Sequence, residues 1–173
     1  YHTLDELPQV MNPESGFIQN CNTTPFTTTS EGNPQRTDYP DYIAEKETDY
    51  LRAQLLRRIL ANEDSFSFEE WADLAFDTYI MKAEEELPAL FEEWNKYKTA
   101  GIEYDDELQQ AIEVLANWDK RGAVNSIATT LFVLWHEKLS RTNENEDWEK
   151  VNALKDVIQV CDSVYGDWRL QWG

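Results

Sequence analysis

Residues 12–25 of this chain read Asn12-Pro13-Glu14-Ser15-Gly16-Phe17-Ile18-Gln19-Asn20-Cys21-Asn22-Thr23-Thr24-Pro25. Asn and Gln amides crowd together here between Pro and Gly residues. Asn is depleted from strands and Pro is confined to strand edges, so this stretch predicts a rigid turn. Carboxamides held at fixed positions on such a turn could donate hydrogen bonds to a carbonyl oxygen.

The turn lies within an irregular segment, residues 1–40. Pro and Gly interrupt this segment repeatedly, and a polar run follows at residues 27–37. Such a composition predicts loops and short extended pieces, with Phe17-Ile18 the best strand candidate. An irregular stretch of this length is unusual in a compact domain, so we expect it to pack against something outside this sequence.

From Asp41 onward the sequence acquires a helical period. A capping box at Ser67–Glu70 predicts a helix start, and Pro88 predicts a kink or a restart. We expect the last helix to run from about Asp147 to near Tyr165. The predicted fold class is therefore mainly α: an irregular or extended segment, residues 1–40, followed by a helical domain of five to six helices, residues 41–173. The apolar positions that carry the period include Leu51, Leu55, Ile59, Leu90, Leu108, Ile112, Leu131, Leu154 and Ile158, together with Trp71, Trp94, Trp118 and Trp135, which we expect in the core.

The composition is that of a globular protein with an acidic surface. Hydrophobic residues make up 41%, and 34 acidic residues against 15 basic ones give a formal charge of -19. Such a charge repels phosphate backbones and anionic lipids, so neither nucleic acid nor a membrane surface is an expected partner. Cys21 and Cys161 are as consistent with two free thiols as with one bridge. His2 and His136 are too far apart in sequence to predict a zinc site.

The opening stretch closely resembles the N-P-x-S-G-[FY]-I-x-N-x-N motif of the penicillin acylase family, whose members are N-terminal-nucleophile amide hydrolases. Weaker similarity continues through Leu115-Ala116-Asn117-Trp118-Asp119 to the closing Tyr165-Gly166-Asp167-Trp168. The resemblance implies that the helical region is an insertion in an α/β/β/α core. It also implies hydrolysis of linear amides in penicillins, acyl-homoserine lactones or other N-acyl compounds, a periplasmic or secreted location, and no organic cofactor.

In that family the nucleophile is the Ser at the N-terminus of a processed chain, and its own α-amino group acts as the base. This sequence begins with Tyr1, which is no such nucleophile. We therefore expect it to be an internal part of the β chain that is inactive alone. Its expected partners are the α chain, the rest of the β chain and an N-acyl substrate.

The resemblance also assigns roles to three residues. Asn22 matches the residue of the oxyanion hole, whereas Asn20 is expected only to brace the loop. Arg52 matches a substrate-binding Arg that faces the cleft, where it could orient the substrate carboxylate or the N-terminal nucleophile. The alternative is a surface Arg paired with an acidic residue of the same helix, with Asp49 and Thr48 close in sequence. Asp41 matches loosely a carboxylate that binds calcium in some relatives, with capping of a helix after Pro40 as the alternative.

A different class of function also fits the charge and the helices. A freestanding acidic helical interaction module, with no catalytic role, would explain both. It would leave the Asn-rich motif without a purpose.

Overall fold

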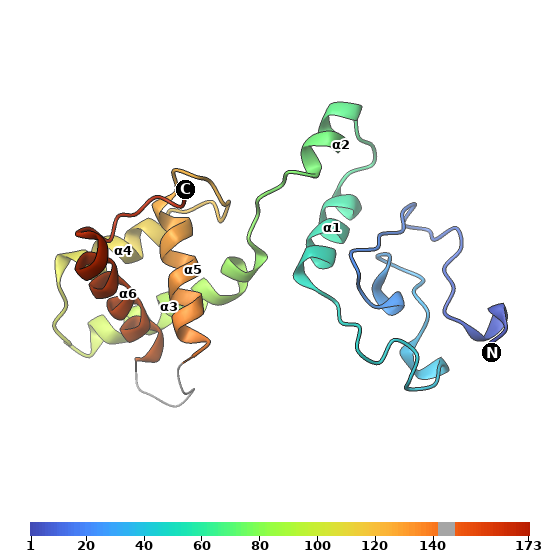
Figure 1. The fold of residues 1–173 in the computed structure, drawn as a ribbon, viewed down its shortest axis with the longest axis horizontal. Helices are drawn as coiled ribbons and strands as arrows, with labels where there is room; N and C mark the ends of the chain where they lie inside the picture. The colour runs from blue at the N-terminus through green and yellow to red at the C-terminus, as the bar shows by residue number, and fades with distance from the viewer. Residues whose placement is uncertain (142–147) are drawn as a thin grey trace. The chain divides into compact units, whose positions relative to one another are not determined.

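The computed structural model describes residues 1–141 and 148–173, and these residues confirm a mainly α fold (Figure 1). They contain six α-helices and no named strand. Three short 3₁₀ turns precede the helices: η1 (Leu4–Glu6), η2 (Pro25–Thr27) and η3 (Arg36–Asp38). The helices are α1 (Leu51–Asn62), α2 (Phe68–Leu74), α3 (Met81–Thr99), α4 (Asp106–Ala116), α5 (Ile127–Leu139) and α6 (Glu149–Tyr165).

The chain divides into two compact units, Tyr1–Phe76 and Asp77–Gly173. Helices α1 and α2 therefore belong to the same unit as the irregular segment. A division into domains 1–40 and 41–173 stays a prediction.

The second unit is a bundle of helices α3 to α6 around one apolar core. Trp94, Trp118 and Trp135 are buried in it, as their helical spacing predicts. The indole N–H of Trp135 donates to the carbonyl of Lys150 at 2.9 Å, which satisfies its one polar atom. Trp71 differs, because it lies in the first unit with 53% of its surface exposed, so its expected place in a core is wrong.

Pro88 lies inside α3 and does not restart a helix as the sequence suggested. The helix begins at Met81 instead, because the preceding residues are extended and pair with a distant turn. The amide of Ile80 donates to the carbonyl of Lys120 at 2.8 Å, and the amide of Gly122 donates to that of Thr78 at 3.0 Å. These long-range bonds separate α3 from α2, and the capping box at Ser67–Glu70 opens only α2.

A carboxylate from α3 caps the start of α6. The Glu93 side chain accepts a hydrogen bond from the amide of Val151 at 2.8 Å and lies 3.8 Å from the ammonium of Lys150. Helix α6 begins at Glu149 after Trp148, whose φ of 63° is left-handed. The expected start at Asp147 lies outside the described residues.

The first unit buries few large side chains. Ala53 is its only fully buried apolar residue within the part of the chain that the structure describes, whereas four polar side chains are buried: Gln19, Thr23, Thr24 and Thr29. The predicted strand at Phe17-Ile18 does not form. Helical structure begins at Leu51 and not near Asp41, because residues 41–46 form turns.

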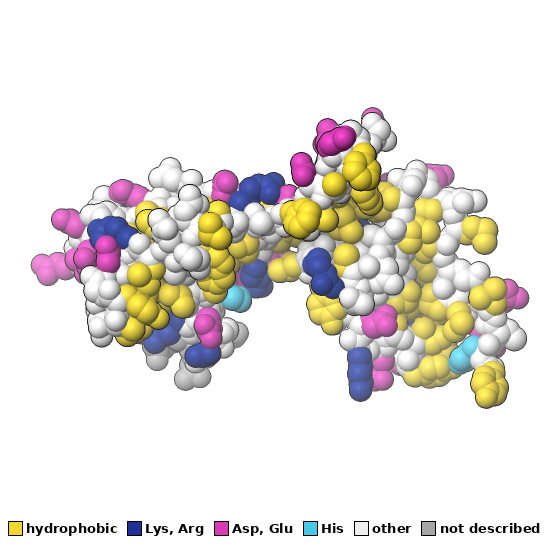
Figure 2. All heavy atoms as spheres, turned by 45° about the horizontal axis from the view of Figure 1, so that its top comes forward, with side chains coloured by type: hydrophobic (Ala, Val, Ile, Leu, Met, Phe, Trp, Pro, Cys, Tyr) yellow, Lys and Arg dark blue, Asp and Glu magenta, His cyan; other side chains and the backbone are white. Residues whose placement is uncertain are grey.

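On the face drawn in Figure 2 the acidic charge is not gathered in one patch. Figure 2 shows Asp and Glu side chains scattered over the visible face, with exposed hydrophobic side chains between them. No helix among residues 1–141 and 148–173 is long and apolar enough to cross a membrane. Both cysteines, Cys21 and Cys161, are free.

Candidate active site

The Asn-rich motif forms a loop, residues 19–28, that is closed at its base. The amide of Gln19 donates to the carbonyl of Thr28 at 2.8 Å, and the Gln19 side-chain NH₂ donates to the carbonyl of Thr27 at 3.1 Å. Gln19 is only 4% exposed, so these bonds are shielded from water. We call this segment the Asn22 loop.

Asn22 lies within this loop in a left-handed conformation, with φ of 57°. Asn tolerates this region better than most residues because its short polar side chain bonds locally. Here the bond comes from a neighbour: the side-chain oxygen of Asn20 accepts from the amide of Asn22 at 2.9 Å. Asn20 thus engages the backbone of the loop, while the Asn22 side chain is left for another contact.

That contact is Arg52, in the first turn of α1. One terminal nitrogen of its guanidinium donates to the carbonyl of Cys21 at 2.7 Å and to the side-chain oxygen of Asn22 at 3.2 Å. The alternative pairing of Arg52 with Asp49 is wrong, because Asp49 binds a different guanidinium, that of Arg57. The structure therefore brings together Asn22 and Arg52, two residues that the sequence singled out.

The contact with Arg52 fixes which way the Asn22 amide points. A guanidinium has only donors, so it can meet only the oxygen of the carboxamide. The NH₂ group must then lie on the other side. Among the described residues, no acceptor for this NH₂ group is present, and Asn22 is exposed. The site therefore presents two N–H donors to whatever occupies the space beside it.

The Asn22 loop is attached at two further points, one to Thr48 before α1 and one to Arg57 within α1. The carbonyl of Thr48 accepts from the hydroxyl of Thr23 at 2.6 Å and from the amide of Thr24 at 3.4 Å. Arg57 binds both carboxylate oxygens of Asp49, at 2.8 and 2.6 Å, and donates to the carbonyl of Thr27 at 2.7 Å. The sequence analysis did not single out Arg57. The signal that could have found it is Asp49, an acidic residue just before α1 that can pair with an Arg of the helix.

Asp41 lies apart from these contacts. The Arg36 guanidinium donates to the carbonyls of Tyr39, Pro40 and Asp41 at 3.3, 3.2 and 2.7 Å, and lies 3.7 Å from the Asp41 carboxylate. Within the described residues, no group of three or more Asp, Glu, His or Cys could hold a metal. Calcium binding by Asp41 in the intact enzyme stays a prediction. Asp41 does not cap a helix, because α1 begins at Leu51.

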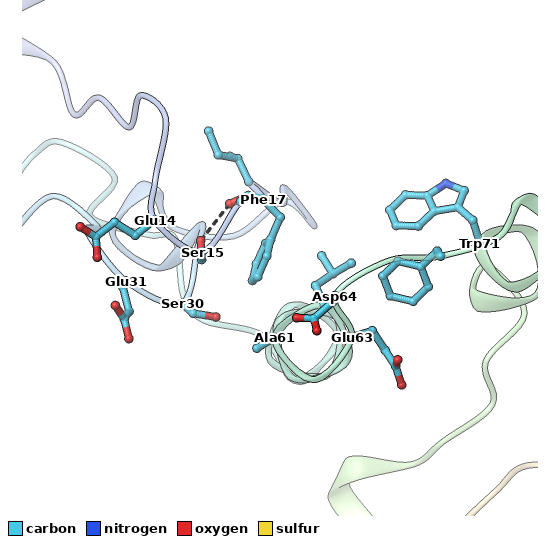
Figure 3. A pocket seen from close by; sticks show the side chains of 13 residues that line it. Glu14, Ser15, Phe17, Ser30, Glu31, Ala61, Glu63, Asp64 and Trp71 are labelled. Atoms are coloured by element: carbon cyan, nitrogen blue, oxygen red, sulfur yellow. Dashed lines mark hydrogen bonds between the residues drawn. The ribbon is translucent and has the colours of Figure 1, made fainter.

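A cleft of about 730 Å³ lies in the first unit at the last turn of α1 (Figure 3). Its walls include the aromatic side chains of Phe17, Phe66 and Trp71, while Glu63 and Asp64 lie nearby at the end of α1. Neither Asn22 nor Arg52 lines this cleft. We place the candidate site at Asn22 and Arg52, because there a side chain of the Asn-rich motif has its oxygen engaged and its NH₂ group left as a donor.

No side chain in the described residues forms a Ser–His or Cys–His pair. His2 contacts Tyr42 and Glu6, while His136 contacts Glu86 and stacks on Phe132. Ser15, a motif residue, bonds Thr29 and the carbonyl of Phe17. The geometry can thus stabilise negative charge on an oxygen, but it shows no activated nucleophile.

An oriented carboxamide N–H donor is the kind of group that stabilises an oxyanion in enzymes such as hydrolases of amides. The family model described as penicillin amidase matches residues 1–171, and the chain belongs to this family. The match confirms the family indicated by the Asn-rich motif and supports an acylase-type function. It also gives the motif a context that a freestanding interaction module would lack.

Proposed function

We propose that this chain takes part in the hydrolysis of linear amide bonds in N-acyl compounds and supplies the oxyanion-hole donor, Asn22. The single observation that carries the proposal is the 3.2 Å hydrogen bond from Arg52 to the side-chain oxygen of Asn22. It commits the oxygen end of the carboxamide and leaves the NH₂ end as a donor. Candidate substrates are penicillins, acyl-homoserine lactones and related N-acyl compounds.

In such a reaction, attack on the amide carbonyl places negative charge on its oxygen. The Asn22 NH₂ group donates to that oxygen most strongly when the charge is present, so it lowers the barrier more than it strengthens substrate binding. One preorganised donor of this kind is worth about 100- to 1000-fold in rate. Arg52 acts by orienting Asn22, and its positive charge adds a favourable potential near the developing anion.

The nucleophile in this proposal is an N-terminal Ser outside residues 1–173. The family supports that assignment, and neither His contacts a Ser or Cys in the described part of the chain. The 173-residue chain alone is then inactive. No step uses an organic cofactor, and a calcium ion held with the help of Asp41 in the intact enzyme is part of the same proposal.

The remainder of a parent acylase is the proposed partner of the first unit. Large apolar side chains are exposed across this unit, among them Met11 at 80%, Phe68 at 81% and Phe76 at 80%. Exposed apolar surface of this kind marks contact sites between protein parts. An oxyanion hole also needs a site from which water is excluded, and Asn22 is exposed here. A periplasmic or secreted location follows from the family and is part of the same proposal, as is the absence of nucleic acid and membrane partners.

The test compares Asn22→Ala with Asn20→Ala in the full-length, processed enzyme. Asn22→Ala should lower kcat by about 100- to 1000-fold with a much smaller change in KM. Asn20→Ala should reduce loop order, and hence stability or processing, more than kcat of correctly folded enzyme. Normal kcat in processed Asn22→Ala enzyme would overturn the assignment and leave the motif as a structural turn.

A further inference from the structure

The Arg57–Asp49 pair lies between the first turns of α1 and the Asn22 loop. Its side chains are 15% and 29% exposed, so the pair is largely removed from solvent. The two-pronged geometry holds the guanidinium in one orientation, which a single-point contact would not do. One prong also donates to the carbonyl of Thr27, at the end of the loop opposite Gln19.

The Thr27 carbonyl is shared by two donors from different segments. It accepts one hydrogen bond from Arg57 at 2.7 Å and another from the side-chain NH₂ of Gln19 at 3.1 Å. Arg57 therefore connects α1 to Asp49, two residues before the helix begins, and to the base of the loop. Arg52 lies on the same helix, five residues earlier. Any rotation or shift of α1 against the loop base would alter the contact between Arg52 and Asn22.

We propose that Arg57 is a positioning residue for the oxyanion donor: through Asp49 and Thr27 it fixes α1 against the Asn22 loop, so that Arg52 meets the Asn22 oxygen. This inference rests on the proposed function of Asn22. Arg57 touches no reacting atom. Its effect is on the geometry of the donor, and a displacement of about 1 Å in such a group can lower a rate about 100-fold.

The principal test is a double-mutant cycle in the full-length, processed enzyme. Arg57→Lys keeps the charge and loses the two-pronged contact, and should lower kcat about 10-fold with KM nearly unchanged; Arg57→Met should lower kcat about 100-fold. In an Asn22→Ala background, Arg57→Lys should lower kcat further by less than about twofold, because the side chain that Arg57 positions is already absent. Asp49→Asn, a milder change to the same pair, should follow Arg57→Lys.

The matched control is Arg141→Lys, just beyond the end of α5, whose partner Glu137 lies four residues earlier with both side chains largely exposed. It should change kcat by less than about twofold. A second readout does not depend on activity: in the 173-residue chain, Arg57→Lys should speed exchange of the Thr24 amide, which bonds Thr48, and leave α5 amides unchanged.

The outcomes separate the two proposals. Equal loss of kcat from Arg57→Lys in both backgrounds, unchanged kcat in all three variants of the pair, or unchanged exchange at Thr24 would overturn the positioning role. Near-normal kcat in Asn22→Ala would instead overturn the function of Asn22, whatever Arg57 does.

Discussion

Arg52 donates a hydrogen bond to the side-chain oxygen of Asn22 at 3.2 Å across 30 residues of sequence. The same nitrogen donates to the carbonyl of Cys21 at 2.7 Å. The arginine therefore holds both the backbone and the side chain at this point of the loop. This relationship turns two separate motif matches into one site, with Arg52 as the residue that orients and Asn22 as the residue that donates.

Replacing Arg52 should therefore impair the chemical step. Arg52→Met removes both bonds and frees the Asn22 amide to rotate, so we expect kcat to fall about 100-fold in the processed enzyme. A lysine can make only one of these two contacts at a time. The kcat of Arg52→Lys should therefore lie between those of Arg52→Met and the wild type. Steady-state kinetics on an acyl substrate measure this. A rise in KM alone would instead indicate direct binding of substrate by Arg52.

The 173-residue chain by itself should hydrolyse no phenylacetyl, acyl-homoserine lactone or penicillin substrate. The reason is chemical: an oxyanion donor without an activated nucleophile cannot form an acyl-enzyme. Product release measured with purified chain is the check. Turnover that disappears with one internal Ser→Ala substitution would contradict this prediction and move the chemistry to that Ser.

Glu93→Gln should destabilise the start of α6 by about 1 kcal/mol, and Glu93→Ala by about 2 kcal/mol. The carboxylate accepts from the amide of Val151 and faces Lys150, and Gln can keep only the first contact. Denaturant unfolding followed by tryptophan fluorescence reports the change. Glu92→Gln is the control, because Glu92 pairs only on the exposed face of α3.

The first turn of α2 should fray as the pH falls. Hydrogen bonds from the Ser67 backbone and then its side chain lower the pKa of Glu70 below its ordinary value. A lowered carboxylate pKa gives stability that is present above the unfolded-state pKa and is lost as the pH falls through the folded-state value. Exchange of the Ser67 amide should therefore accelerate at acid pH relative to its intrinsic rate. The same exchange in Glu70→Gln should lose this added pH dependence.

The two thiols should react at different rates. Burial, with a smaller contribution from Asp162, raises the pKa of the Cys161 thiol, and this residue is only 1% exposed. Cys21 is half-buried in the Asn22 loop. A thiol reagent at neutral pH should label Cys21 first and Cys161 only on unfolding. Rapid labelling of both in native protein would show that α5 and α6 separate readily.

The sequence by itself determined most of the helical unit. Apolar residues at helical spacing predicted α4 and α5 and the burial of Trp94, Trp118 and Trp135. An amphipathic helix is stable when its apolar face packs against other helices, so these side chains lie in the core of the bundle. Ser67–Glu70 capped its helix as predicted, since a capping box is a local interaction. The Asn-rich motif indicated the family for a related reason, because the spacing of its residues is contained in one short stretch.

The tertiary structure decided what depends on distant partners. Pro88 lies within α3, and the start of that helix at Met81 follows the hydrogen bonds of Thr78 and Ile80 to residues 120–122. Asp49 binds Arg57 and not Arg52, although both arginines are close to it in sequence. Near Asp41, the backbone carbonyls accept hydrogen bonds from Arg36. Local pattern fixes which residues can pair. Only the folded chain decides which pairs form, because each choice depends on where segments tens of residues apart come to lie.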